Sequence, residues 1–279
     1  MDMIKEILFE TIEITFFVAV MMIAIDLMNV FSKGKLKLLL VGSNKVKQYF
    51  ISSFIGAIPG CFGGFTNVSL YIHGLISFGA LAGSMIASSG DEAFVLIAMV
   101  PDKAFYIFML LFFLGVVGGF LADYIVKKLK VKICINCEEF VIHEHELSFK
   151  HYITEHIFNH VIKKHLWKIF VWTLLALTIV HLSLEYLHLE RFTSQYKIAF
   201  IFIAALVGLI PESGPHLIFI KLFADGLVPF SVLLTSSIVQ DGHGMLPLLS
   251  YSVEDSIKVK LFNFIFGLVI GLTLFFAGF

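Results

Sequence analysis

The sequence predicts an all-α polytopic membrane protein made of two inverted-topology repeats, each with broken helices and a re-entrant hairpin. Three observations lead to this prediction: a very apolar composition, a duplicated motif, and apolar segments too short to cross a bilayer. Hydrophobic residues make up 58% of the 279 residues and charged residues only 15%, with a mean hydropathy of +0.93. A water-soluble domain could hardly hide so much apolar surface from solvent.

A stretch in the first half of the chain occurs again in the second half. Shifting the sequence by 152 positions, without a gap, places residues 56–92 on residues 208–244. A duplicated unit in so apolar a chain is typical of transporters built from two homologous halves, whose broken segments meet near the bilayer midplane. The shared residues are Gly56, Ile58, Pro59, Gly74, Leu75 and Phe78, which fall on Gly208, Ile210, Pro211, Gly226, Leu227 and Phe230.

Several apolar segments are too short or too interrupted to be ordinary spans. Residues 48–58 would extend roughly 16 Å as a helix, about half of the ~30 Å hydrocarbon core. Pro59 and Gly60 then break the segment, because proline removes a backbone donor. We therefore expect residues 48–73 to form a re-entrant hairpin. Residues 75–100 are long enough to cross, but the polar run at 88–92 interrupts them, and lipid tolerates such a break only where it is buried in protein or lines a cavity.

The second half repeats this plan, with a hairpin at 197–224 and a broken span at 227–252. Each half begins and ends with an ordinary span. The first of these, at 7–31, is too long for a signal-peptide core and lacks a small-residue cleavage site, so we expect a retained span. We expect three crossings per half, or ten spans in all if every hairpin leg crosses. The ordinary spans are 7–31, 104–126, 166–186 and 257–279.

Three units follow from this pattern: a first membrane repeat at 1–127, a Cys/His-rich linker at 128–165, and a second membrane repeat at 166–279. Lysines cluster at 33–47 and at 127–164, and short basic loops lie on the cytoplasmic side. This predicts a cytoplasmic linker and both termini outside, in the cell (inner) membrane. The expected partners are the lipid bilayer and a transported ion. A homodimer is one alternative, and we expect no nucleic-acid partner; the net charge of -1 carries little information.

Four polar breaks, at 59–64, 88–92, 211–216 and 240–244, are expected to face a common centre. Ionisable groups at membrane depth cost about 2.5 to 3.5 kcal/mol each on insertion scales, so they rarely persist without a role. Carboxylates and imidazoles at unwound helix ends suit a divalent cation, because freed oxygens replace its hydration water. We expect the ion to be bound by Cys61, Asp91, Glu92, Glu212, Ser213, His216, Asp241 and His243. The backbone breaks are expected at Pro59, Gly60, Gly90, Pro211, Gly214 and Gly242.

Other interpretations of these residues stay open. Glu212 and Asp241 could instead cap the broken helices or pair with Lys221. Helix N-termini in the hairpins could bind an anion, although the carboxylates argue against it. Trivalent arsenic would prefer several thiolates, yet Cys61 is the only cysteine in the breaks. Oxygen and nitrogen ligands favour manganese, with zinc, cobalt or cadmium less favoured. The sequence contains no Walker motif and no H-E-x-x-H on an apolar segment, so ATP hydrolysis and metalloprotease activity are not indicated.

Two further features concern metal binding and coupling. In the linker, Cys134 and Cys137 with His156 and His160 have the ligand types of a structural zinc site. The alternative is a solvated, His-rich linker. In the first span, Asp26 is expected to couple transport to protons, because an isolated intramembrane carboxylate is a usual proton relay. Alternatively, its carboxylate reaches the cytoplasmic interface. We expect no required cofactor beyond the transported metal.

Several motifs are distributed over nearly the whole chain: GAIPGCFGG, SFGAL, SSGDEAF, the Cys-x2-Cys with HEHE, HYITEHIFNHVIKKH, GLIPESGPH and QDGHG. Together they resemble the motifs of the ten-segment heavy-metal exporters, whose members are described as manganese transporters or arsenic-efflux-type permeases. The resemblance implies an inner-membrane exporter with two inverted repeats.

We therefore expect a secondary-active transporter, not an enzyme, that exports a divalent transition metal through a midplane site between the repeats. Manganese is the first candidate. Two alternatives are an organoarsenical or oxyanion efflux permease, and an intramembrane metal-dependent enzyme.

Overall fold

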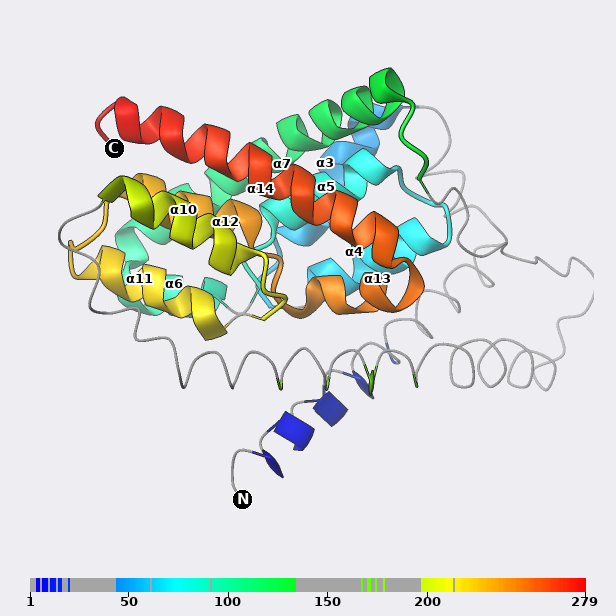
Figure 1. Cartoon of the computed structure of the whole chain (residues 1–279), viewed down its shortest axis with the longest axis horizontal. Helices are drawn as coiled ribbons and strands as arrows, with labels where there is room; N and C mark the ends of the chain where they lie inside the picture. Colours follow the sequence, from blue (N-terminus) through cyan, green and yellow to red (C-terminus); the bar gives the residue numbers. More distant parts are fainter. Residues whose placement is uncertain are drawn as a thin grey trace, which may run out of the picture.

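The computed structural model is a bundle of helices joined by short breaks (Figure 1). It describes residues 44–60, 62–90, 92–133, 197–212 and 214–279, together with isolated positions within 4–20 and 167–178. These residues contain no strand, so the all-α prediction is confirmed for them. The predicted site residues outside the described part are Asp26, Cys61, Asp91, Cys134, Cys137, His156, His160 and Ser213.

The helices of the two halves begin and end at equivalent positions. Shifting by 152 positions places α3 on α10 and α5 on α12, and places the start of α7 on the start of α14. The α4 range falls on η3 together with α11. The duplication in the sequence is therefore also a duplication of helix ends. The first half comprises α3 (Lys45–Gly56), α4 (Phe62–Ile72), α5 (Phe78–Ala87), α6 (Glu92–Met99) and α7 (Pro101–Leu129). The second comprises α10 (Lys197–Gly208), η3 (Gly214–His216), α11 (Leu217–Ala224), α12 (Phe230–Val239), η4 (Gly242–Met245), α13 (Leu246–Tyr251) and α14 (Val253–Phe276).

The turns after α4 and α11 show how the sequence specifies these ends. Gly74 has φ 67° and Gly226 has φ 72°, a left-handed conformation that glycine adopts without a Cβ penalty. After α4, the Gly74 amide donates to Tyr71 O and the Leu75 amide to Leu70 O, each at 2.8 Å. The same pair of bonds follows α11. This is the Schellman arrangement, which satisfies the last carbonyls of a helix.

Helices α7 and α14 are long and apolar enough to cross a membrane, with 29 and 24 residues. Both start earlier than the expected 104 and 257, for identifiable reasons. Pro101 occupies the first turn of α7, where its missing amide costs nothing. Ser252 caps α14 by accepting a hydrogen bond from the Asp255 amide at 3.2 Å. In Figure 1, α7 ends on the right and α14 ends at the C-terminus on the left, so the two run in opposite directions.

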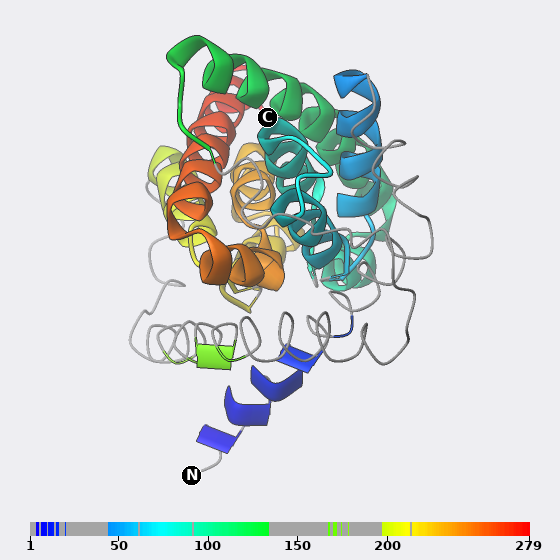
Figure 2. The same cartoon turned by 90° about the vertical axis from the view of Figure 1, so that its right-hand side faces the viewer.

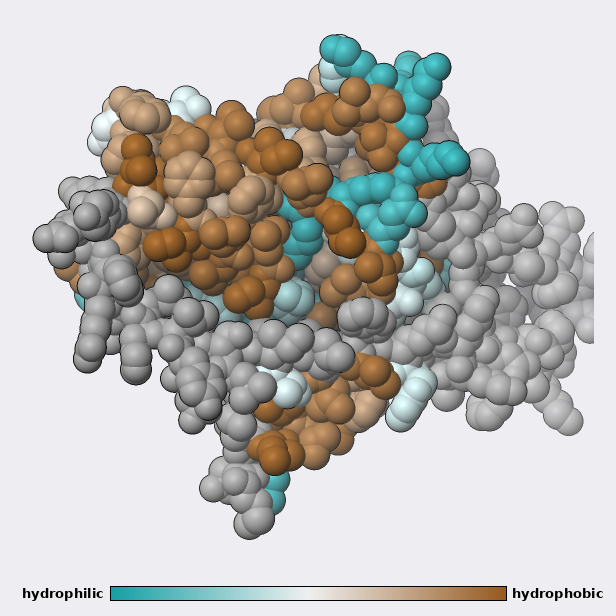
Figure 3. All heavy atoms as spheres, in the orientation of Figure 1, coloured by the Kyte–Doolittle hydropathy of each residue, from teal (hydrophilic) through white to brown (hydrophobic). Residues whose placement is uncertain are grey.

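Each long helix has a glycine face toward the protein and an apolar face away from it. Phe113 of α7 is 56% exposed and Val269 of α14 is 57% exposed. Figure 3 shows apolar residues over most of the described face, while hydrophilic residues gather where α14 begins and α7 ends. Large exposed apolar surfaces on monomers mark contact with a membrane or a partner, so these faces fit a lipid environment.

Helices α5 and α12 lie inside the bundle and pack against the glycine faces of α7 and α14. Every residue of α5 is buried, and Figure 2 shows α7 crossing over the bundle with α3 and α14 on either side. A Cβ added at Gly83 of α5 would lie 2.3 Å from Gly115 O of α7. In the second half, a Cβ at Gly271 of α14 would lie 1.9 Å from the Thr235 hydroxyl of α12. Small residues thus allow close approach of helix backbones in both halves.

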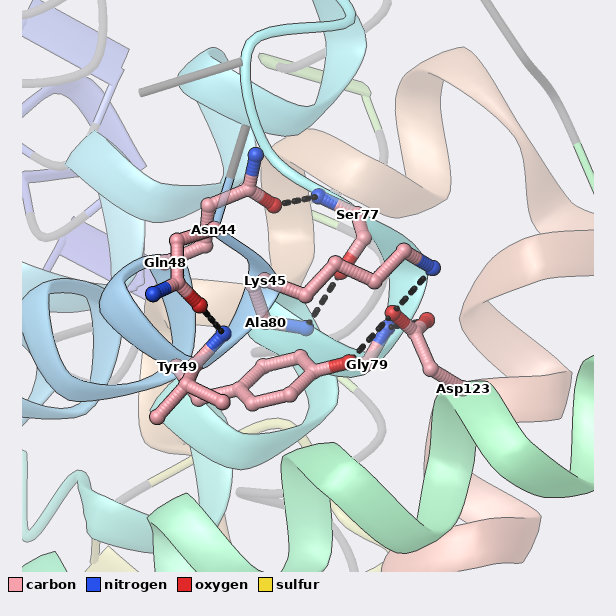
Figure 4. A network of polar contacts seen from close by, with 9 residues as sticks. Asn44, Lys45, Gln48, Tyr49, Ser77, Gly79, Ala80 and Asp123 are labelled. Atoms are coloured by element: carbon pink, nitrogen blue, oxygen red, sulfur yellow. Dashed lines mark hydrogen bonds and ion pairs between the residues drawn. The ribbon is translucent and has the colours of Figure 1, made fainter. Parts of the chain in front are cut away.

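A polar network fixes one end of the first half (Figure 4). The Asp123 carboxylate of α7 accepts hydrogen bonds from the Gly79 amide at 2.7 Å, the Tyr49 hydroxyl at 2.8 Å and the Lys45 ammonium at 3.1 Å. It therefore joins α3, α5 and α7 at one point. The equivalent position in the second half is Phe275, so this anchor belongs to the first half.

The two halves interlock through their hairpins. Helix α4 packs on η4 and α13 of the other half, and α11 packs on α6. The Tyr71 hydroxyl of α4 donates to Asp255 of α14 at 2.7 Å. At the equivalent positions, the Lys103 ammonium of α7 lies 4.7 Å from the ring centroid of Phe223. The second leg of each hairpin therefore contacts the opposite half, which brings the breaks of both halves together.

We expect the close contact between α5 and α7 to require glycine at position 83. In Gly83→Ala, the new Cβ meets backbone at Gly115 that cannot move freely, so the free energy of unfolding should fall by about 1–3 kcal/mol. The matched control is Gly118→Ala on α7, where the nearest atom is the flexible tip of Ile86. Thermal unfolding in detergent should show a lower midpoint for Gly83→Ala alone. Equal midpoints for the two variants would contradict this packing.

Candidate ion site between the four breaks

The four predicted breaks lie in contact with one another. The Gly60 amide of the first break donates to Gly90 O of the second at 2.9 Å. The Gln240 side-chain amide of the fourth break donates to Ser88 O of the second at 3.1 Å. A Cβ added at Gly64 would lie 2.9 Å from Gly244 Cα, so the first and fourth breaks also touch. The third break joins the fourth through a pair of side chains described below.

The breaks after α5 and α12 have the same backbone construction. Ser88 and Gln240 end their helices in extended conformation, with ψ 128° and 146°. Two residues later, Gly90 and Gly242 have φ 49° and 50°. A side chain is rarely accommodated at such angles, so the glycines allow the chain to turn at once into the next helix. The Gln240–Ser88 hydrogen bond connects two positions that the repeat makes equivalent.

Glu92 is a deeply buried carboxylate at the first residue of α6. The residue is only 1% exposed. Within the described part of the chain, neither of its carboxylate oxygens has a hydrogen-bond partner. An isolated buried carboxylate is costly, and the N-terminus of a helix offsets only part of that cost. Glu92 therefore requires a cation or a proton at its oxygens.

Further buried oxygens without partners belong to the same two breaks. Among the described residues, Ser89 Oγ, Gln240 Oε1 and Asp241 Oδ2 accept no hydrogen bond. Buried polar atoms in proteins are almost always paired, and other buried atoms without a partner in the described ranges lie away from the breaks, as at Ser52 and Asn263. Carboxylate, amide and hydroxyl oxygens are the ligand types of hard cations.

Glu212 and His243 form the pair that joins the third and fourth breaks. His243 Nε2 lies 2.8 Å from Glu212 Oε2, and both side chains are less than a tenth exposed. His216 lies beside Glu212 as well. Its Nε2 is 3.4 Å from Ile210 O and its Nδ1 is 3.5 Å from the Ser236 hydroxyl, and the residue is fully buried. The three residues thus share one region.

Asp241 has a partner that the sequence reasoning missed. The Lys260 ammonium of α14 forms an ion pair with Asp241 Oδ1 and donates to Gly208 O, the end of α10, at 3.1 Å. The alternative of a lysine partner for Asp241 is therefore met by Lys260, whereas the side chain of Lys221 lies outside the described residues. One indication was available, because a lysine in an apolar span is itself an intramembrane ionisable residue.

The described side chains of the breaks are either paired with one another or without a described partner, and they do not make up a complete set of metal ligands. Across the described ranges, no group of three or more His, Cys, Asp or Glu side chains gathers in an arrangement that could hold a metal. Cys61, Asp91 and Ser213 lie outside those ranges. The structure thus brings the four breaks together, while the binding of a metal ion by the eight predicted residues stays a prediction.

The fold and the site define a polytopic membrane protein with buried carboxylates where its helices break. Residues 4–185 and 143–278 match the family described as "Putative, 10TM heavy-metal exporter". The chain therefore belongs to this family of multi-pass membrane proteins, which confirms the resemblance seen in its motifs. Comparisons with curated proteins and with solved structures gave no match.

The Glu212–His243 pair is expected to contribute to stability. Glu212→Gln removes the charged acceptor from a buried hydrogen bond, so the free energy of unfolding should fall by about 1.5–3 kcal/mol. Glu254→Gln is the matched control, because Glu254 pairs with Lys258 while its own side chain is 76% exposed, and an exposed pair contributes less than about 1 kcal/mol. Equal losses in denaturant unfolding would show that the buried pair does not form.

Proposed function

We propose that the chain is a secondary-active transporter that exports a divalent transition metal, with manganese as the first candidate, through a site between the four breaks. One observation carries the proposal. Buried oxygens that have no partner among the described residues, on Ser89, Glu92, Gln240 and Asp241, belong to two equivalent breaks that are hydrogen-bonded to each other. A cation that sheds its hydration shell would satisfy these acceptors.

The donor set supports a divalent ion of hard or borderline character. The described breaks contribute the carboxylates of Glu92, Glu212 and Asp241 and the imidazoles of His216 and His243, and Lys260 adds an ammonium. Such a set is best balanced by added positive charge. Oxygen ligands with an imidazole suit manganese better than soft, thiolate-seeking ions.

The helix arrangement supports transport across the membrane. We propose that the two halves are inverted repeats, which fits the opposite directions of α7 and α14 (Figure 1). We also propose that α3 and α4 form a re-entrant hairpin. They have 12 and 11 residues, and the Asn67 amide of α4 donates to Ser52 O of α3 at 3.1 Å. Broken helices at a repeat interface are typical of alternating-access transporters.

Several expectations from the sequence extend this proposal. Asp26 would couple export to the proton gradient. Cys134, Cys137, His156 and His160 would bind zinc in a cytoplasmic linker between the two repeats. The termini would lie outside the inner membrane. Asp26 and the four linker residues lie outside the described part of the chain.

Transport in proteoliposomes tests the proposed function. Purified protein should move Mn²⁺ across the vesicle membrane, and Glu92→Gln should slow this transport by at least about ten-fold, because it removes a charge from the ion site. Asp102→Asn is the control, since Asp102 lies in the exposed first turn of α7.

Two outcomes would contradict the proposal. One is the absence of transport of manganese, zinc, cobalt and cadmium by the wild-type protein. The other is that Cys61→Ser abolishes arsenic resistance in cells while Glu212→Gln does not. This result would support the oxyanion or organoarsenical permease instead.

A further inference from the structure

Lys260 extends from α14 into the junction between α10 and the break after α12. Its ammonium contacts Asp241 Oδ1 and the Gly208 carbonyl. The Asp241 side chain is fully buried and that of Lys260 is 12% exposed. Lys260 follows the charged first turns of α14, and the pair is still costly there because both charges are buried.

The repeat shows that this pair is not needed to build the junction. The positions equivalent to Lys260, Asp241 and Gly208 are Phe108, Ser89 and Gly56. The first half therefore forms the same turn after α5, with the same glycine angle at Gly90, without either charge. Because well-packed apolar residues often replace buried ion pairs with no loss of stability, a role beyond packing is indicated for Lys260.

The second carboxylate oxygen of Asp241, Oδ2, is not engaged by Lys260 and could bind an ion. Oδ2 is buried and has no partner within the described ranges, as does the neighbouring Gln240 Oε1. Lys260 also lines a crevice of about 560 Å³ among the described residues, together with Pro211, Met245 and Leu261. Because this crevice is almost wholly apolar, it takes the aliphatic stem of Lys260, and the Gly208 carbonyl is the acceptor that remains for the ammonium away from Asp241.

We propose that Lys260 is a built-in counter-cation of the ion site, which holds Asp241 when the site is empty and is displaced when a transported ion arrives. This inference rests on the proposed function. A divalent ion interacts with a carboxylate twice as strongly as a monovalent ion at the same distance, so it displaces the ammonium where sodium or potassium does not. Competition with Lys260 also weakens binding enough for release, which transport requires.

Replacing Lys260 with an uncharged side chain of similar length separates these roles. In proteoliposomes, Lys260→Met should lower the KM for Mn²⁺ by about ten-fold, because the competitor is gone. The maximal rate should fall, because the ion leaves more slowly, and excess sodium should now inhibit uptake. Lys260→Arg should keep the wild-type KM and rate. Lys258→Met, two residues earlier on α14 and paired with Glu254 and Asp255, should do the same.

A second variant covers the case in which Lys260→Met does not fold. Asp241→Asn/Lys260→Met leaves no buried charge at the junction, so it should fold, and its KM for Mn²⁺ should rise because a ligand is lost. Wild-type kinetics in this double variant would show that the pair is only structural and would overturn the inference. So would an unchanged KM in Lys260→Met. If the wild-type protein moves no divalent metal, the proposed function fails and the inference fails with it; if the wild-type protein transports but the variants match it, only the inference fails.

Discussion

The structure depends on the requirement that broken backbone inside an apolar protein finds hydrogen-bond partners within the protein. The breaks meet this requirement by bonding to each other. The Gly60 amide donates to Gly90 O, and the Gln240 side chain donates to Ser88 O across the two halves. The breaks can therefore exist inside the apolar protein because they lie close enough to satisfy one another's backbone hydrogen bonds. The same convergence brings the buried carboxylates into one region.

Small residues make this convergence geometrically feasible. Glycines of α7 and α14 let these helices lie directly on α5 and α12, so the inner helices are buried while the outer faces of the long ones stay apolar and exposed. Because the second leg of each hairpin packs on the opposite half, neither half can move without affecting contacts of the other.

The sequence predicted the architecture better than the site. The offset of 152 anticipated equivalent helix ends, because the glycines and prolines that end helices were duplicated with it. It could not predict which buried side chains meet. The Glu212–His243 and Asp241–Lys260 contacts join residues from different segments, and Lys260 has no charged counterpart in the first half. Ligation by Cys61, Asp91 and Ser213 stays a prediction, as does the linker zinc site.

The most direct test is a structure of the protein soaked with Mn²⁺, in which anomalous scattering locates the ion. We expect the anomalous peak between the breaks after α5 and α12, with oxygens of Glu92 and Asp241 in direct contact with the ion and the Lys260 ammonium displaced from Asp241. A peak only at the Cys/His-rich linker, or an ion held outside the bundle with these carboxylates unchanged, would contradict the account.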